Sequence, residues 1–150
     1  MDNRRIRTSK SLIRANGIKK NQTAYEHSKF ERELIEQKEQ LKESTNELRD
    51  VVAKQNRALK NQQIIDPILL CAMTNDINIA EQKIAHTQSH INNISMLKSK
   101  KLAELTQLHI KQKLYDKHLN KLSFEHEKER DKKELHDRIQ ERKPILEKFL

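Results

Sequence analysis

The sequence has very little glycine, proline or aromatic residue: its 150 residues include one Gly, two Pro, no Trp and only 3% aromatic residues. So few turn-forming residues exclude a fold of many short strands, and so few aromatic side chains leave little to fill a globular core. One glycine also excludes a glycine-rich phosphate-binding loop. We therefore expect neither a β-sheet nor an enclosed enzyme pocket.

Long apolar runs and cysteine are equally scarce. The most apolar stretch, residues 64–73, contains Asp66 and Pro67 and is shorter than the roughly 18 residues that a bilayer-spanning helix needs. The single Cys71 excludes an internal disulfide, fits a reducing compartment and has no evident base beside it. His86 and His90 lack a third ligand at helical spacing. The sequence thus predicts a soluble protein that is not an enzyme, with no metal site and no cofactor.

Charge, by contrast, is abundant and unevenly distributed. Charged residues make up 35% of the chain, which has a net charge of +9. Residues 1–22 form a basic arm, which contains seven Lys and Arg residues and a single acidic residue, Asp2. Such an arm binds an acidic protein, a nucleic acid backbone or an anionic membrane. Because the arm has no aromatic residue for base stacking, we favour an acidic protein over nucleic acid. A mitochondrial presequence is a weaker interpretation of the same arm.

The second half of the chain has the most regular apolar pattern. Apolar residues recur from Leu70 to Leu122 at alternating spacings of three and four, which is typical of a coiled coil. A helix of about 53 residues would be roughly 80 Å long. The seam positions are Leu70, Met73, Ile77, Ala80, Ile84, Thr87, Ile91, Ile94, Lys98, Lys101, Leu105, Leu108, Gln112, Tyr115, Leu119 and Leu122.

Two of these seam positions are lysines, and the stripe ends at Leu122. We expect a local slip of the stripe, in which Lys98 and Lys101 reach outward along their methylene stems, with Leu97 and Leu102 one position outside the seam. Residues 125–150 hold eight acids and eight bases. They are expected to project as a single helix.

A first helix is expected from about residue 24 to 63, with the basic arm as an extension in front of it. Gly17 weakens the helix, and Thr23 with Glu26 forms a possible capping box after it. One seam position of this helix repeats every seven residues at Leu34, Leu41 and Leu48. The other is expected four residues after each leucine, at Thr45, Val52 and Leu59, which also puts Lys38, Gln55 and Gln62 on the seam.

The turn between the helices is predicted at residues 64–67. Asp66 is suited to cap a helix and Pro67 to begin it, so a second helix should run from about residue 68 to 143, where Pro144 stops it. A short connection favours an antiparallel arrangement folded about residue 65, with Leu41 near Ser89. The predicted fold is therefore all-α: a long antiparallel two-helix coiled-coil hairpin, one domain over residues 1–150, and monomeric.

Two parts of this hairpin are candidate partner-binding surfaces. The turn gathers more apolar side chains than a two-helix seam can cover, and we expect Ile65, Ile68 and Leu69 to contact a partner there. An equally supported interpretation is a local apolar plug that caps the coiled coil. In the basic arm, the candidate contact residues are Arg4, Arg5, Arg7 and Arg14.

The basic start RRIRTSKSLIRANGIKKNQ, the turn NQQIIDPILL and the charged end IKQKLYDKHLNKLSFEHEKERDKKELHDRIQERK together resemble the FliJ/YscO family. These are small central-stalk proteins of flagellar and virulence type III secretion systems. The resemblance implies a bacterial cytoplasmic protein at the secretion apparatus that couples the hexameric secretion ATPase to the export gate. Residues 1–22 and 125–150 would then contact the ATPase, and the turn would contact the gate. The alternatives are a generic coiled-coil tether or assembly subunit, a type III chaperone and a nucleic acid binder.

Overall fold

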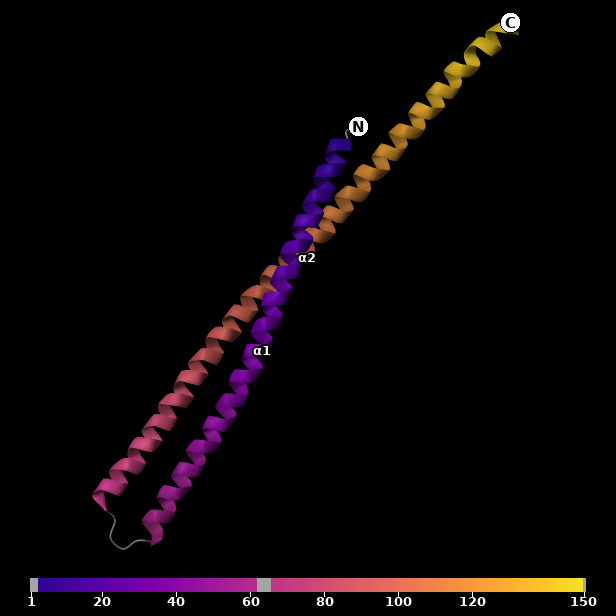
Figure 1. Ribbon diagram of the computed structural model, residues 1–150. Coiled ribbons are helices and arrows are strands. Elements are labelled where there is room, and N and C mark those ends of the chain that lie inside the picture. Colours follow the sequence, from indigo (N-terminus) through magenta and orange to yellow (C-terminus); the bar gives the residue numbers. More distant parts are fainter. Residues whose placement is uncertain (1–2, 62–65, 150) are drawn as a thin grey trace. The chain divides into compact units, whose positions relative to one another are not determined.

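The computed structural model describes residues 3–61 and 66–149. They form two helices, α1 (Asn3–Asn61) and α2 (Pro67–Lys148), and the described residues include no strand. Figure 1 shows the two helices. The contacts divide the chain into two units: unit 1 is residues 1–23 with 104–150, and unit 2 is residues 24–103. In each unit a segment of α1 packs antiparallel to a segment of α2, which confirms the all-α hairpin.

The start of α2 agrees with its predicted cap. Asp66 accepts a hydrogen bond at Oδ1 from the backbone N–H of Ile68 (3.0 Å), and its carbonyl accepts one from Leu70 (3.0 Å). Pro67 is the first residue of α2, where its missing N–H leaves no donor unpaired. Of the predicted turn, residues 64 and 65 lie outside the described residues.

The antiparallel register about residue 65 is confirmed in both units. In unit 2, Lys83 forms an ion pair with Glu47 (3.6 Å), and these two residues are equally far from residue 65 along the chain. In unit 1, Asn16 bonds to Gln112 (2.9 Å), and this pair is nearly equidistant from residue 65. Two helices joined by a short turn pack side by side, so the turn position alone fixes which residues face each other.

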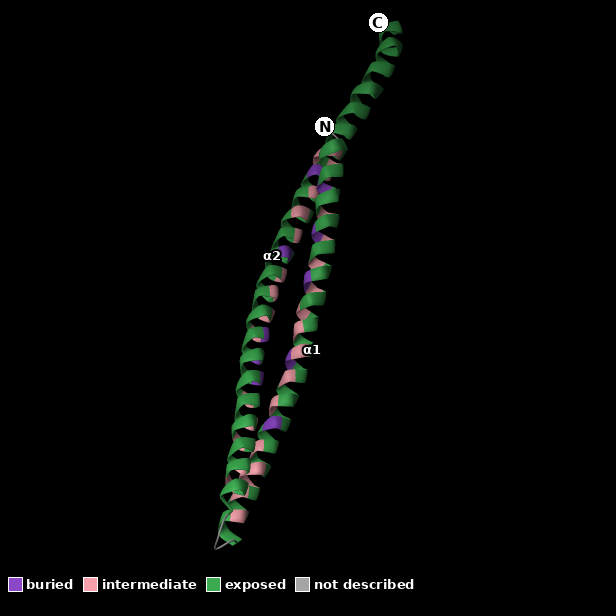
Figure 2. Ribbon diagram, turned by 60° about the vertical axis from the view of Figure 1, so that its left-hand side comes forward, coloured by how far each residue is buried: buried purple, intermediate pink, exposed green. Residues whose placement is uncertain are grey.

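The seam of α2 is the one that the heptad pattern predicted: the sixteen positions from Leu70 to Leu122 are buried or half-buried. Figure 2 shows how, within each unit, buried and half-buried positions line the facing sides of the helices. In unit 2, Leu34, Ile91 and Ile94 form a buried apolar cluster, against which Phe30 and Leu41 pack.

The seam of α1 corrects one prediction. Leu34, Leu41 and Leu48 do lie on it, but its second position comes three residues after each leucine, at Gln37, Ser44 and Val51. Thr45, Leu59 and Lys38 are exposed, Val52 and Gln55 are half-buried, and Gln62 lies outside the described residues. A spacing of three and four keeps the seam on one side of the helix, so a small polar residue such as Ser44 is buried because of its position and not because of its hydropathy.

The predicted slip of the stripe at Lys98 and Lys101 is also wrong. Both lysines stay on the seam while Leu97 and Leu102 are exposed. The lysine ammonium groups pair with carboxylates of α1: Lys98 with Glu31 (3.6 Å) and Lys101 with Glu26 (2.6 Å). The apolar stems thus remain in the interface while the charges meet partners at its edge, so the helices have no need to change register.

Both helices are longer than predicted. α1 begins at Asn3 rather than near residue 24 and passes through Gly17 without a break. Thr23 caps no helix; its hydroxyl donates to the carbonyl of Lys19 four residues earlier (2.8 Å). At the other end, Pro144 lies inside α2, which continues to Lys148. Since proline's fixed φ is compatible with a helix and this segment is exposed, the carbonyl left without its usual donor remains open to solvent.

Candidate functional site

The candidate surface in unit 1 is built on a paired stretch of α1 and α2. Asn16 is the buried centre of this pairing: its amide Nδ2 donates to the carbonyl of Leu108 (3.0 Å) and to Oε1 of Gln112 (2.9 Å). Close by, the ammonium of Lys20 lies 3.0 Å from Nδ1 of His109. An ammonium can only donate, so Nδ1 accepts this hydrogen bond. The basic arm is therefore held as a helix against α2.

The sequence indicates this pairing only weakly, because one seam position of the arm carries small polar residues. Ser9, Asn16 and Thr23, spaced by seven residues, are all buried, yet none of them is apolar. A signal was nevertheless present in the sequence. The heptads of α2 continue to Leu122, and folding about residue 65 places residues 108–122 opposite residues 8–22.

Nearly all of the net charge belongs to unit 1. Residues 1–23 hold seven Lys and Arg residues against one Asp, and residues 104–124 hold four Lys residues against Glu104 and Asp116. Residues 125–150 are neutral in sum, and the 12 basic side chains of unit 2 are almost balanced by 11 acids. The paired part of unit 1 is thus strongly cationic, which favours anionic partners.

An open groove of about 600 Å³ runs between the helices in this cationic part. Arg4, Arg5 and Leu12 of α1 line one side, and Leu114, Tyr115 and His118 of α2 line the other. A second groove of about 520 Å³ shares Leu114 and adds Ile110, Lys113 and Lys117 of α2. Both grooves therefore combine an apolar floor with cationic side chains.

The four predicted arginines all lie on α1 in this unit and are exposed. The structure brings Arg4 and Arg5 to the first groove, whereas Arg7 and Arg14 are not among its lining residues. Only part of the predicted set therefore shares one site, and Leu12, Ile110 and Leu114, which the structure places in the grooves, had not been selected from the sequence.

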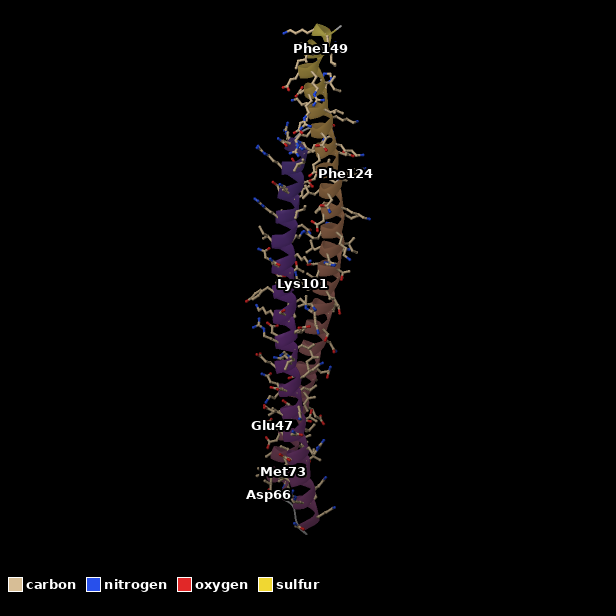
Figure 3. All side chains as sticks on the ribbon, turned by 90° about the vertical axis from the view of Figure 1, so that its right-hand side faces the viewer. Glu47, Asp66, Met73, Lys101, Phe124 and Phe149 are labelled. Carbon is tan, nitrogen blue, oxygen red and sulfur yellow. The ribbon has the colours of Figure 1, made fainter. Side chains whose placement is uncertain are left out.

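The other predicted contact residues lie at the turn, in unit 2. Ile68 and Leu69 are 79% and 41% exposed at the start of α2, while Ile65 lies outside the described residues. Figure 3 labels Asp66 directly before α2 and Met73 further along the same helix. Exposed large apolar side chains at a helix start are a surface on which a partner gains binding energy by burial.

The last part of α2, residues 127–149, is exposed throughout. In unit 1, α2 extends past the start of α1 (Figure 2). Exposed apolar residues occur along it at Leu135, Ile139 and Leu146, and Figure 3 labels Phe149 at its end. This segment agrees with the prediction that the end of the chain projects as a single helix. It is the continuation of α2, which is partly buried up to His126.

The described part of the chain also holds the two histidines and the cysteine that were considered as metal ligands or nucleophile. No group of three or more His, Cys, Asp or Glu side chains there is placed to hold a metal ion, and His86, His90 and Cys71 are exposed. Residues 3–61 and 66–149 also contain no helical segment apolar and long enough to cross a bilayer.

The chain matches no protein-family model, no curated protein and no solved structure.

Proposed function

We propose that the chain is a non-enzymatic coiled-coil subunit that holds other proteins, with one contact surface on the basic part of unit 1 and another at the start of α2. The observation that carries this proposal is that the seam and the exposed faces of the helices differ in composition. The heptad seam is used for pairing α1 with α2, while the surfaces left outside it are strongly basic in unit 1 and apolar at Ile68 and Leu69.

The specific role that we propose is the central stalk of a bacterial type III secretion apparatus. This follows the resemblance to the FliJ/YscO family and is supported by the exposed arginines of unit 1 and by the exposed Ile68 and Leu69 in unit 2. Residues 1–22 and 125–150 would bind the secretion ATPase hexamer in the cytoplasm. Ile65, Ile68 and Leu69 would bind the export gate.

The test uses the purified full-length chain with the secretion ATPase and the cytoplasmic part of the gate protein from the same organism. Replacing Arg4, Arg5, Arg7 and Arg14 together by Glu should weaken ATPase binding about tenfold or more, because each change reverses a charge. Replacing Ile68 and Leu69 by Asp should abolish gate binding only. Ile79→Asp is the control, since Ile79 is also exposed on α2. Unchanged binding of both partners by both variants would refute the stalk.

A second candidate is a generic tether that binds other helical proteins along α2. Its support is a set of exposed apolar residues on the side of α2 away from the seam, namely Met96 in unit 2 and Ile110, Leu114 and Phe124 in unit 1. A secretion ATPase gene beside the gene for this chain would favour the stalk. Light scattering of the purified chain tests the expected monomer.

A further inference from the structure

Three exposed apolar residues and three cations of unit 1 form one surface, which we call the basic–apolar surface: Leu12, Ile110 and Leu114 with Arg5, Lys113 and Lys117. Leu114 lines both grooves and so joins them. The apolar members are 47%, 53% and 60% exposed, respectively. Large apolar side chains that lie this open within a groove are typical of protein-binding sites.

The floor of this surface has the spacing of a helix-binding site. Ile110 and Leu114 are four residues apart, lie on one face of α2 and line the second groove, while Leu12 of α1 lines the first groove together with Leu114. A floor contributed by two adjacent helices fits a cylinder better than a flat sheet of lipid headgroups. An amphipathic helix places its own apolar stripe into such a groove.

The cations select the charge of the occupant. Arg5 lines the first groove, Lys113 and Lys117 line the second, and the only acid among the lining residues of either groove is Asp116. Carboxylates flanking the apolar stripe of a bound helix would meet these cations. Nucleic acid would also be attracted, but phosphate contacts make no use of the leucine and isoleucine floor.

We propose that the basic–apolar surface binds an acidic amphipathic helix of a partner protein. The proposal deepens the proposed function, because it rests on the basic part of unit 1 being a contact surface and states the chemistry of what binds there. It does not depend on the partner being a secretion ATPase.

The experiment measures fluorescence anisotropy of a labelled synthetic peptide of about three heptads, with Leu on its seam and Glu at the flanking positions. The full-length chain is titrated into this peptide and into a scrambled peptide of the same composition. The scrambled peptide keeps the charge but has no apolar stripe. We expect the scrambled peptide to bind at least about tenfold more weakly.

Two matched pairs of variants locate the site. Leu114→Asp should weaken binding of the acidic peptide about tenfold or more, whereas Ile79→Asp, on the same heptad position of α2 in unit 2 and 56% exposed, should not. Arg5→Glu should also weaken peptide binding. Lys54→Glu should not, although it makes the same change of charge at an exposed position of α1 in unit 2. Circular dichroism should show equal helical content in all four variants, because the replaced side chains are exposed.

Three results would overturn the proposal. The first is equal binding of the scrambled peptide, which would leave charge alone as the cause. The second is no loss of affinity in Leu114→Asp. The third is binding of phosphatidylserine vesicles or random duplex DNA by a chain that does not bind the acidic peptide. Since no ATPase is present, peptide binding that depends on Leu114 would stand even if the ATPase experiment failed.

Discussion

Lys101 on α2 and Glu26 on α1 form an ion pair across unit 2, with 2.6 Å between Nζ and Oε2. The lysine occupies a seam position, and only 26% of its side chain is exposed. Its stem therefore takes the place of an apolar residue, while its ammonium pairs with a carboxylate of α1 at the edge of the interface. Lys98, three residues before Lys101, forms the same kind of ion pair with Glu31 of α1. Paired lysines can thus replace apolar residues without shifting the seam.

Reversing the charge at position 101 should reveal this pair. Lys101→Glu brings a carboxylate next to Glu26, and we expect the free energy of unfolding to fall by about 1 kcal/mol. Adding Glu26→Lys should restore about half of that loss, because the pair is re-formed with its polarity reversed. Urea unfolding followed by circular dichroism measures both values. Lys100→Glu, at an exposed neighbouring position, is the control; an equal loss there would assign the effect to net charge.

Asn16 should stabilise unit 1 through its two hydrogen bonds to α2. Asn16→Ala removes both and leaves the oxygens of Leu108 and Gln112 without this donor, so we expect a loss of about 1–2 kcal/mol in the free energy of unfolding. Asn21→Ala, at an exposed position of the same helix, carries the same gain in helix propensity and is the control. The difference between the two variants in urea unfolding measures the hydrogen bonds, and no difference would contradict their role.

The fold was predictable where large apolar residues mark the seam. Leu70 to Leu122 specify one face of α2, and Asp66 with Pro67 specify where that helix begins. The prediction failed where burial depends on the partner rather than on the residue itself. Ser44 is buried by its position on the seam of α1, and Asn16 is buried where its amide donates hydrogen bonds to α2. Since neither residue is apolar, hydropathy alone does not predict that either side chain is buried.

The candidate surface was predictable only in its charge. Arg4 and Arg5 are visible in the sequence as members of a basic cluster, but their position in a groove depends on pairing of the arm with α2. Leu114 lies four residues from Ile110 and off the predicted seam, which marks it as an exposed apolar residue. That it meets Leu12 from the other helix follows only once the register is known.

Gly17 offers a simple test of the continuous α1 helix. A Cβ added at Gly17 would meet no atom within 4 Å, and its φ is not positive. Gly17→Ala should therefore raise the free energy of unfolding by about 1 kcal/mol, because alanine restricts the unfolded chain and favours the helix. The midpoint of thermal or urea unfolding should increase accordingly. A decrease would show that the helix needs glycine there, as a break near this position would require.

His27 should be a destabilising residue in the seam of α1. Its Nδ1 lies 3.9 Å from Oε1 of Glu31 on the same helix, while its buried Nε2 has no hydrogen-bond partner among the described residues. An unpaired buried polar atom costs about 1–3 kcal/mol. His27→Leu removes that atom and supplies an apolar side chain, so we expect the free energy of unfolding to rise by about 1 kcal/mol.

The matched control for this change is His86→Leu, since His86 is exposed on α2 of the same unit. Both variants gain the helix propensity of leucine, but only His27→Leu removes a buried unpaired nitrogen. Urea unfolding at neutral pH should therefore show the larger increase for His27→Leu. If His27→Leu is instead less stable than the unmodified chain, the imidazole makes a contact across the seam that leucine cannot replace, and the unpaired nitrogen is not what limits stability there.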